Sequence, residues 1–221
     1  MTPDLPVPFH SLITPGFSIL ITTLSQSRLS GRIGSQPLTW TDRAKIALGT
    51  ARGLSHLHNK NLIHLNIKAS NVFLNENLDP IIGAPLSKDY FAIFRGSELP
   101  AHLPANIAAN ARLDATLDTF SFGIFLFGLV TGKSPAWRNP VNHLTMREIM
   151  LRASTPLVMI DKGEISDWSN CLFYIGKDCT NDHILQKLAM KDVLKTLKIL
   201  HDLHKEGRIA KFVNKAIESL F

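Results

Sequence analysis

The sequence predicts a mainly α fold of the α+β class, with a small β contribution in its N-terminal third. Apolar residues recur at helical spacing from about 41 to 58 and again from 209 to 220. The segment 118–130 is almost entirely apolar, which is typical of a buried helix. The candidate strands are short, so helices should build most of the core.

Composition places the chain among ordinary globular proteins, with 45% apolar and 19% charged residues. The longest apolar stretch, Phe120–Val130, is shorter than the roughly 20 residues that a membrane span needs. The N-terminus has no basic region ahead of an apolar run, so we expect no signal peptide. Cys171 and Cys179 lie eight residues apart on a predicted helix, roughly 12 Å, too far for a disulfide. We expect idle, buried thiols.

The net charge of +6 is concentrated near the C-terminus, where residues 187–221 hold eight Lys or Arg against four Asp or Glu. The lysines at 187, 191, 195 and 198 recur at helical spacing, which predicts one solvated helix face. No interleaved aromatic residues or nucleic-acid motif accompany them, so we do not expect nucleic-acid binding.

The N-terminal half should contain short strands around one long helix. A turn at Thr14–Gly16 and the β-branched run Phe17–Thr23 predict a strand pair within residues 5–24. After a loop at 31–37, Thr39 or Thr41 caps a helix from about 41 to 58, with Asp42 in its first turn. Short apolar runs then predict small strands at 61–64, 72–74 and 80–82.

The C-terminal half should be largely helical. Prolines keep residues 84–115 irregular, and the central helix 118–130 ends at Gly132 and Pro135. A second loop is expected at about 140–162. Beyond it we predict helices to the end of the chain, with breaks at Gly163, Gly176–Asn181 and Gly207 and a final amphipathic helix.

Four groups of residues, in order, resemble plant receptor-like serine/threonine protein kinases of the leucine-rich-repeat type. They are Ala47–His58 with His64–Leu74, Asp118–Gly123, Leu129–Pro135, and the pair Lys177–Thr180 and Met190–Val193. The resemblance covers roughly residues 17–200 and implies a protein-kinase-like fold. It implies a remnant of the N-terminal lobe in residues 1–24, the C-terminal lobe in 25–204 and an amphipathic helix in 205–221.

The resemblance also locates the catalytic loop, which in this family reads His-Arg-Asp followed by Lys and Asn. His64 is retained as a structural residue, and Lys68 and Asn71 are retained from the chemical set. Asn66 replaces the catalytic Asp, and an amide cannot accept the proton of a substrate hydroxyl. Leu65 replaces the Arg that would anchor a phosphorylated activation loop.

The magnesium site that the family builds is missing its carboxylate. The Asp of the Asp-Phe-Gly motif aligns with Gly83 or Ala84, so Asn71 is at most a single remaining ligand and no metal site is intact. No Gly-rich loop or strand lysine precedes the hinge, which predicts an N-terminally truncated domain. ATP and Mg could bind only weakly, with adenine at the candidate hinge residues Ile21, Thr22 and Thr23.

Structural positions of the family are partly kept. Asp118 is retained and is implied to hold the backbone of the catalytic loop from the central helix. The Ala-Pro-Glu motif maps onto Pro104–Asn106, and the Arg that pairs with its Glu maps near Lys187. Because both Asn106 and Lys187 differ from the family pair, the lobe should still fold without maintaining the active geometry.

These observations predict a pseudokinase that acts as a binding or scaffolding module in receptor-kinase-type signalling. It would bind a partner kinase or a kinase substrate, and it would be cytoplasmic, or lie at the cytoplasmic face of the plasma membrane within a longer receptor. One alternative is residual ATP-dependent phosphoryl transfer to Ser or Thr through Lys68 and Asn71. Another is a decayed gene fragment without function.

Overall fold

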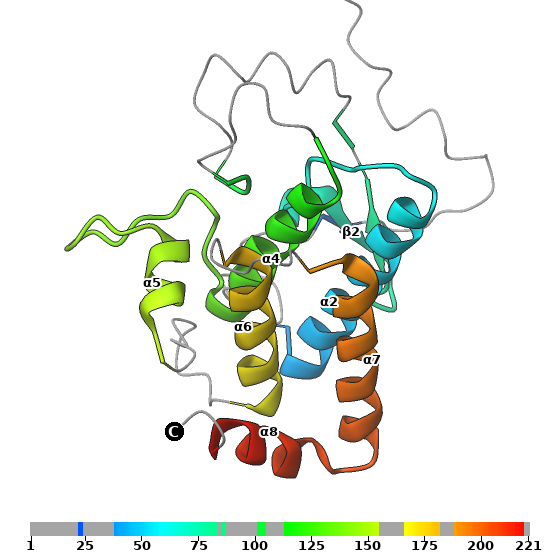
Figure 1. Cartoon of the computed structure of the whole chain (residues 1–221), viewed down its shortest axis with the longest axis vertical. Coiled ribbons are helices and arrows are strands. Elements are labelled where there is room, and N and C mark those ends of the chain that lie inside the picture. The colour runs from blue at the N-terminus through cyan, green and yellow to red at the C-terminus, as the bar shows by residue number, and fades with distance from the viewer. Residues whose placement is uncertain are drawn as a thin grey trace, which may run out of the picture.

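The computed structural model describes residues 22–23, 38–83, 85–86, 101–104, 113–154, 166–181 and 188–218 (Figure 1). Helices dominate these residues, as predicted. The helices are α2 (Trp40–Asn59), α4 (Thr116–Thr131), α5 (Met146–Arg152), α6 (Asp167–Thr180), α7 (Met190–Lys205) and α8 (Ile209–Glu218), with the 3-10 helix η2 at Ala69–Asn71. None of the helices in the described part is both long and apolar enough to cross a membrane.

Helix α2 begins at a reciprocal cap and is held to α4 by a buried arginine. The Thr39 amide donates to the Asp42 carboxylate at 2.9 Å, and the Asp42 amide donates to the Thr39 hydroxyl at 3.2 Å. The Arg43 guanidinium donates to the carbonyl of Leu38 at 3.1 Å and also to that of Leu129 near the end of α4. Burial lowers the pKa of Arg43 to about 10, against the opposing charge of Asp42.

Helix α4 is the centre of the core. Every residue from Leu117 to Thr131 is buried, and Gly132 ends the helix in the left-handed conformation, with φ 68°. Helix α6 crosses it closely, because a Cβ at Gly123 would lie 2.6 Å from Thr180 Cγ2. A Cβ at Gly176 would lie 2.7 Å from the Phe127 ring. The break predicted at Gly176–Asn181 therefore begins too early: α6 continues through Gly176 and ends at Thr180.

A three-stranded antiparallel sheet has the order β1-β2-β3, and its strands β2 and β3 lie in the segment between α2 and α4. Its strands are β1 (Thr22–Thr23), β2 (Val72–Leu74) and β3 (Pro80–Ile82). Thr22 pairs with Leu74, and Val72 pairs with Ile82. The strands predicted at 72–74 and 80–82 are thus confirmed, whereas the rest of the N-terminal strand pair lies outside the described residues.

The strand predicted at 61–64 is wrong. Asn61 has φ 57°, so the chain turns sharply after α2 instead of extending. The amide of His64 donates to a side chain of α4 and the His64 carbonyl accepts from Leu86 at 2.9 Å, so these groups form no strand ladder. Leu62 in this run is 54% exposed, and His64 is the buried residue at its end.

The loop predicted at 140–162 is also partly wrong, because α5 forms within it. The Thr145 hydroxyl and the Glu148 carboxylate cap each other's amides at 3.2 and 2.7 Å, and Met146 and Met150 are buried in the core. The break at Gly207, with φ 66°, and the final amphipathic helix are confirmed, with Ile209 buried.

The two cysteines behave as predicted. Both lie in α6, buried and unpaired. Burial raises the pKa of the Cys171 thiol to about 12 and raises that of Cys179 as well. Neither thiol is therefore a reactive nucleophile in the folded protein.

Candidate functional site

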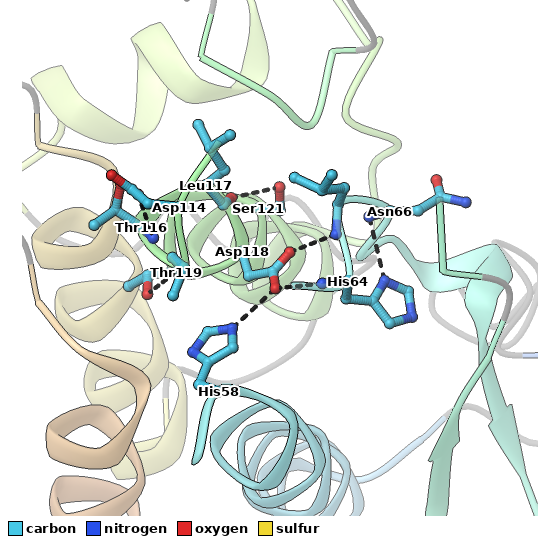
Figure 2. A network of polar contacts seen from close by, with 11 residues as sticks. His58, His64, Asn66, Asp114, Thr116, Leu117, Asp118, Thr119 and Ser121 are labelled. Atoms are coloured by element: carbon cyan, nitrogen blue, oxygen red, sulfur yellow. Dashed lines mark hydrogen bonds and ion pairs between the residues drawn. The ribbon is translucent and has the colours of Figure 1, made fainter. Parts of the chain in front are cut away.

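The residues predicted to form a catalytic loop lie between the end of α2 and strand β2, beside the first turn of α4 (Figure 2). Asp118 is fully buried in the first turn of α4. Its Oδ2 accepts from the His64 amide and its Oδ1 from the Leu65 amide, each at 2.7 Å. His58, in the last turn of α2, places Nε2 at 2.9 Å from Oδ2. One carboxyl group thus joins two helices to the loop.

Leu65 shows why the loop needs this support. Its φ of 62° lies in the left-handed region, which costs a residue with a large side chain on the order of 1–3 kcal/mol. The side chain is 1% exposed and packs with Leu103 and Leu117 in a small apolar cluster. The hydrogen bonds that Asp118 accepts and this packing together hold the strained turn.

The turn brings Asn66 and Asn71 together. The Asn71 amide nitrogen Nδ2 donates to the Asn66 carbonyl at 2.8 Å, and the Asn71 backbone amide donates to the Lys68 carbonyl at 2.9 Å. Gly83, after β3, donates its amide to the Asn71 carbonyl at 3.0 Å. The side chain of Asn66 points away from Asp118 (Figure 2), and Lys68 is half-buried.

Two buried imidazoles flank the loop. The backbone amide of Asn66 donates to His64 Nδ1 at 3.2 Å, so this ring nitrogen is unprotonated. Burial lowers the pKa of His64, although the Asp118 carboxyl and the Gly83 carbonyl oppose the change. Burial, together with the charge of Lys68, lowers the pKa of His102 to about 4. The surroundings of Lys68 therefore include a neutral imidazole.

The other predicted site residues are only partly described. Thr22 and Thr23 form β1, which pairs with β2 and lies against η2, so the candidate hinge lies beside the catalytic loop. Ile21, Ala84, Asn106 and Lys187 lie outside the described residues. In the described ranges no cluster of three or more His, Cys, Asp or Glu side chains could hold a metal ion.

Sequence reasoning missed His58 and His102 as parts of this site. The signal for His58 was its place at the end of α2, just before the loop. No local pattern marks His102, because its contact with the loop joins segments nearly 40 residues apart in the chain.

Comparison with known proteins identifies a family for this chain. The family model for protein tyrosine and serine/threonine kinases matches residues 14–197. Interleukin-1 receptor-associated kinase-like 2 from Homo sapiens is 31% identical over 153 residues, 65% of this chain and 24% of that protein. The leucine-rich repeat receptor protein kinase MSP1 from Oryza sativa subsp. japonica is 29% identical over 192 residues, 76% of this chain and 14% of that protein.

A second plant relative is the probable LRR receptor-like serine/threonine-protein kinase IRK from Arabidopsis thaliana. It is 34% identical over 110 residues, 46% of this chain and 11% of that protein. The chain thus spans about a quarter or less of the length of these curated relatives. It is distantly related both to plant leucine-rich-repeat receptor kinases and to interleukin-1 receptor-associated kinase-like proteins.

Proposed function

Because the chain belongs to the protein tyrosine and serine/threonine kinase family, we propose that it is a pseudokinase: a kinase-like lobe that binds protein partners and transfers no phosphate. The proposal rests on two features of one loop. Hydrogen bonds hold its backbone in place, and an amide side chain stands where the family has the Asp that acts as general base. Asn66 occupies that position, while Asp118 and Asn71 still hold the backbone of the turn.

The carboxyl group that contacts the loop in the described part of the chain, that of Asp118, cannot replace the missing base. Asp118 is 0% exposed, and both of its oxygens already accept hydrogen bonds from the loop. A general base must reach the substrate proton within about 2.6–3.2 Å, directly or through one water. His64 is equally buried, and its Nδ1 accepts from the Asn66 amide.

Magnesium binding is weakened in the same place. Mg²⁺ sites in nucleotide enzymes rely on one or two carboxylates together with the phosphates. Gly83 supplies no side chain, and Asn71 already uses its Nδ2 as a donor within the loop. The side-chain oxygen of Asn71 could still approach a metal, as one neutral ligand.

Residual phosphoryl transfer is the second candidate function. It is favoured by Lys68 and Asn71, which keep their places on an ordered loop. A positioned general base contributes about 10²–10⁴ in rate, so transfer without one would be slow rather than absent.

The test is transfer of radiolabelled phosphate from ATP to a Ser/Thr substrate, with Mg²⁺ or Mn²⁺. The wild-type chain should show no transfer above the level of Lys68→Ala, the matched control that removes the phosphate-neutralising charge. Asn66→Asp restores the carboxyl group and shows whether the base alone is limiting. Wild-type transfer that Lys68→Ala abolishes would establish the residual enzyme instead.

The remaining parts of the proposal concern context. Protein kinase domains interact with other proteins, and the expected partner is a kinase or a kinase substrate in receptor-kinase-type signalling, at the cytoplasmic side of a membrane or in the cytoplasm. Residues 1–24 would supply the hinge side, 25–204 the C-terminal lobe and 205–221 an added amphipathic helix.

A further inference from the structure

A groove of about 670 Å³ lies on the side of the lobe built by α2, the β2–β3 turn and α7. Its lining comes from the outer face of α2, from Asp79 and Pro80, and from His201 on α7, and it includes no residue of the catalytic loop. Helices α2 and α7 run side by side in this region (Figure 1). The volume falls within the range of about 300–1,000 Å³ that is usual for ligand pockets.

Two glycines make the floor of this groove. A Cβ at Gly49 would lie 2.4 Å from Pro80 Cγ, and one at Gly53 would lie 3.0 Å from Ile82 Cδ1, so the β2–β3 hairpin rests directly on the helix. Leu48, the glycines and Pro80 therefore present an apolar strip between the edges of the groove.

The edges of the groove are basic. Arg52 and His56 are exposed one turn apart on α2. On α7, Lys198 and Lys205 lie one turn before and one turn after His201, and both are exposed. Burial lowers the pKa of His201, and the charges of Lys205 and Arg52 lower it further, so cations from both helices lie near its ring.

Three carboxylates lie around the groove. Asp79, in its lining, pairs with Lys45 at 2.9 Å and lies close enough to Arg52 for that charge to lower the Asp79 pKa, whereas Glu206 pairs with Arg208 at 2.8 Å. Asp202 is the carboxylate that opposes the cations around His201. No ion pair involves Arg52 in the part of the chain that the structure describes.

An apolar strip between basic edges suits an extended acidic peptide. Its carboxylates would meet cations on both helices, and an apolar side chain between them would cover the floor. The lining includes no Phe, Tyr or Trp on which a nucleobase could stack, which disfavours single-stranded nucleic acid. A phosphate group is bound best by a cluster of Arg side chains. The single cations along this groove are spaced apart, so they suit separate carboxylates better than one phosphate.

We propose that this groove is a docking site for an Asp- or Glu-rich segment of a partner protein, with an apolar residue between the acids. Because it shares no residue with the catalytic loop, the site stands whether or not the chain transfers phosphate.

The test is fluorescence anisotropy with the full chain, without nucleotide, and a labelled peptide of four glutamates around a central leucine. The peptide should bind, and a peptide with lysines in place of the glutamates should not. Arg52→Glu and, separately, Lys205→Glu should each weaken binding about tenfold or more, because each puts a like charge against the peptide.

The matched control is Lys195→Glu, which makes the same change of charge on an exposed part of α7 away from His201. It should change the affinity less than about twofold, and thermal unfolding should show that all three variants fold. Equal weakening by Lys195→Glu, or no binding of the acidic peptide by the folded wild-type chain, would overturn the proposal. Binding of a single-stranded oligonucleotide that Arg52→Glu abolishes would assign the groove to nucleic acid instead.

Discussion

Replacing Asp118 by Leu should destabilise the lobe by more than the small change in side-chain volume suggests. The substitution keeps a buried side chain of similar volume and removes the acceptors for the His64 and Leu65 amides. It also removes the partner of His58 at 2.9 Å. The perturbation therefore leaves two buried N–H groups facing an apolar side chain.

The magnitude follows from these groups. Each buried donor left unsatisfied costs about 1–3 kcal/mol. Relaxation of the turn would relieve part of the backbone strain at Leu65, and this offsets part of the cost. The net loss in the free energy of unfolding should be about 2–5 kcal/mol, a large share of the roughly 5–15 kcal/mol that stabilises a typical domain. Asp118→Asn, which keeps one acceptor, should lose about half as much.

Urea unfolding followed by circular dichroism at 25 °C measures the loss, with the slope against urea as a check on two-state behaviour. The matched control is Asp202→Asn on the exposed face of α7, which should change stability by less than about 0.5 kcal/mol. A loss below about 1 kcal/mol for Asp118→Leu would refute the view that Asp118 holds the catalytic loop.

Three further predictions concern the fold around the site. Thr39→Ala removes the cap of α2 and should cost about 0.5–2 kcal/mol in urea unfolding, whereas Thr39→Ser should be nearly neutral. Gly123→Ala places a methyl group 2.6 Å from Thr180 Cγ2 and should lower the free energy of unfolding by about 1–3 kcal/mol; a neutral result would show that α4 and α6 are not in such close contact. The folded pKa of His102, about 4, lies below its unfolded value, so the unfolded chain binds more protons between about pH 6.5 and 4. Stability should therefore fall as the pH falls through this window, by up to about 3 kcal/mol from this residue, and His102→Gln should flatten the fall in pH-dependent urea titrations.

Much of the fold could be predicted because its signals are local. The cap at Thr39, the apolar run of α4 and the glycine that ends it are each set by residues within a few positions of one another. The residues that the resemblance assigns to one loop, His64, Asn66, Lys68 and Asn71, lie close together in the sequence, and the structure joins Asn71 to Asn66 by a hydrogen bond.

What could not be predicted depends on distant contacts. The left-handed turn at Leu65 exists because Asp118, 53 residues away, accepts the Leu65 amide. His102 has no pattern around it, and its low pKa arises only from burial against the loop. Gly176 looked like a helix break because its role, the close approach of Phe127, belongs to another helix.

We infer that the lobe keeps its kinase fold while its loop no longer forms a magnesium–nucleotide site. Thermal unfolding of the purified chain with and without millimolar ATP and Mg²⁺ tests it most directly. A ligand at a hundredfold excess over its Kd, bound only to the folded state, would add about 2.7 kcal/mol of stability. The account predicts a cooperative transition at the same temperature with and without the nucleotide. A magnesium-dependent rise in Tm that Asn71→Ala removes would contradict it.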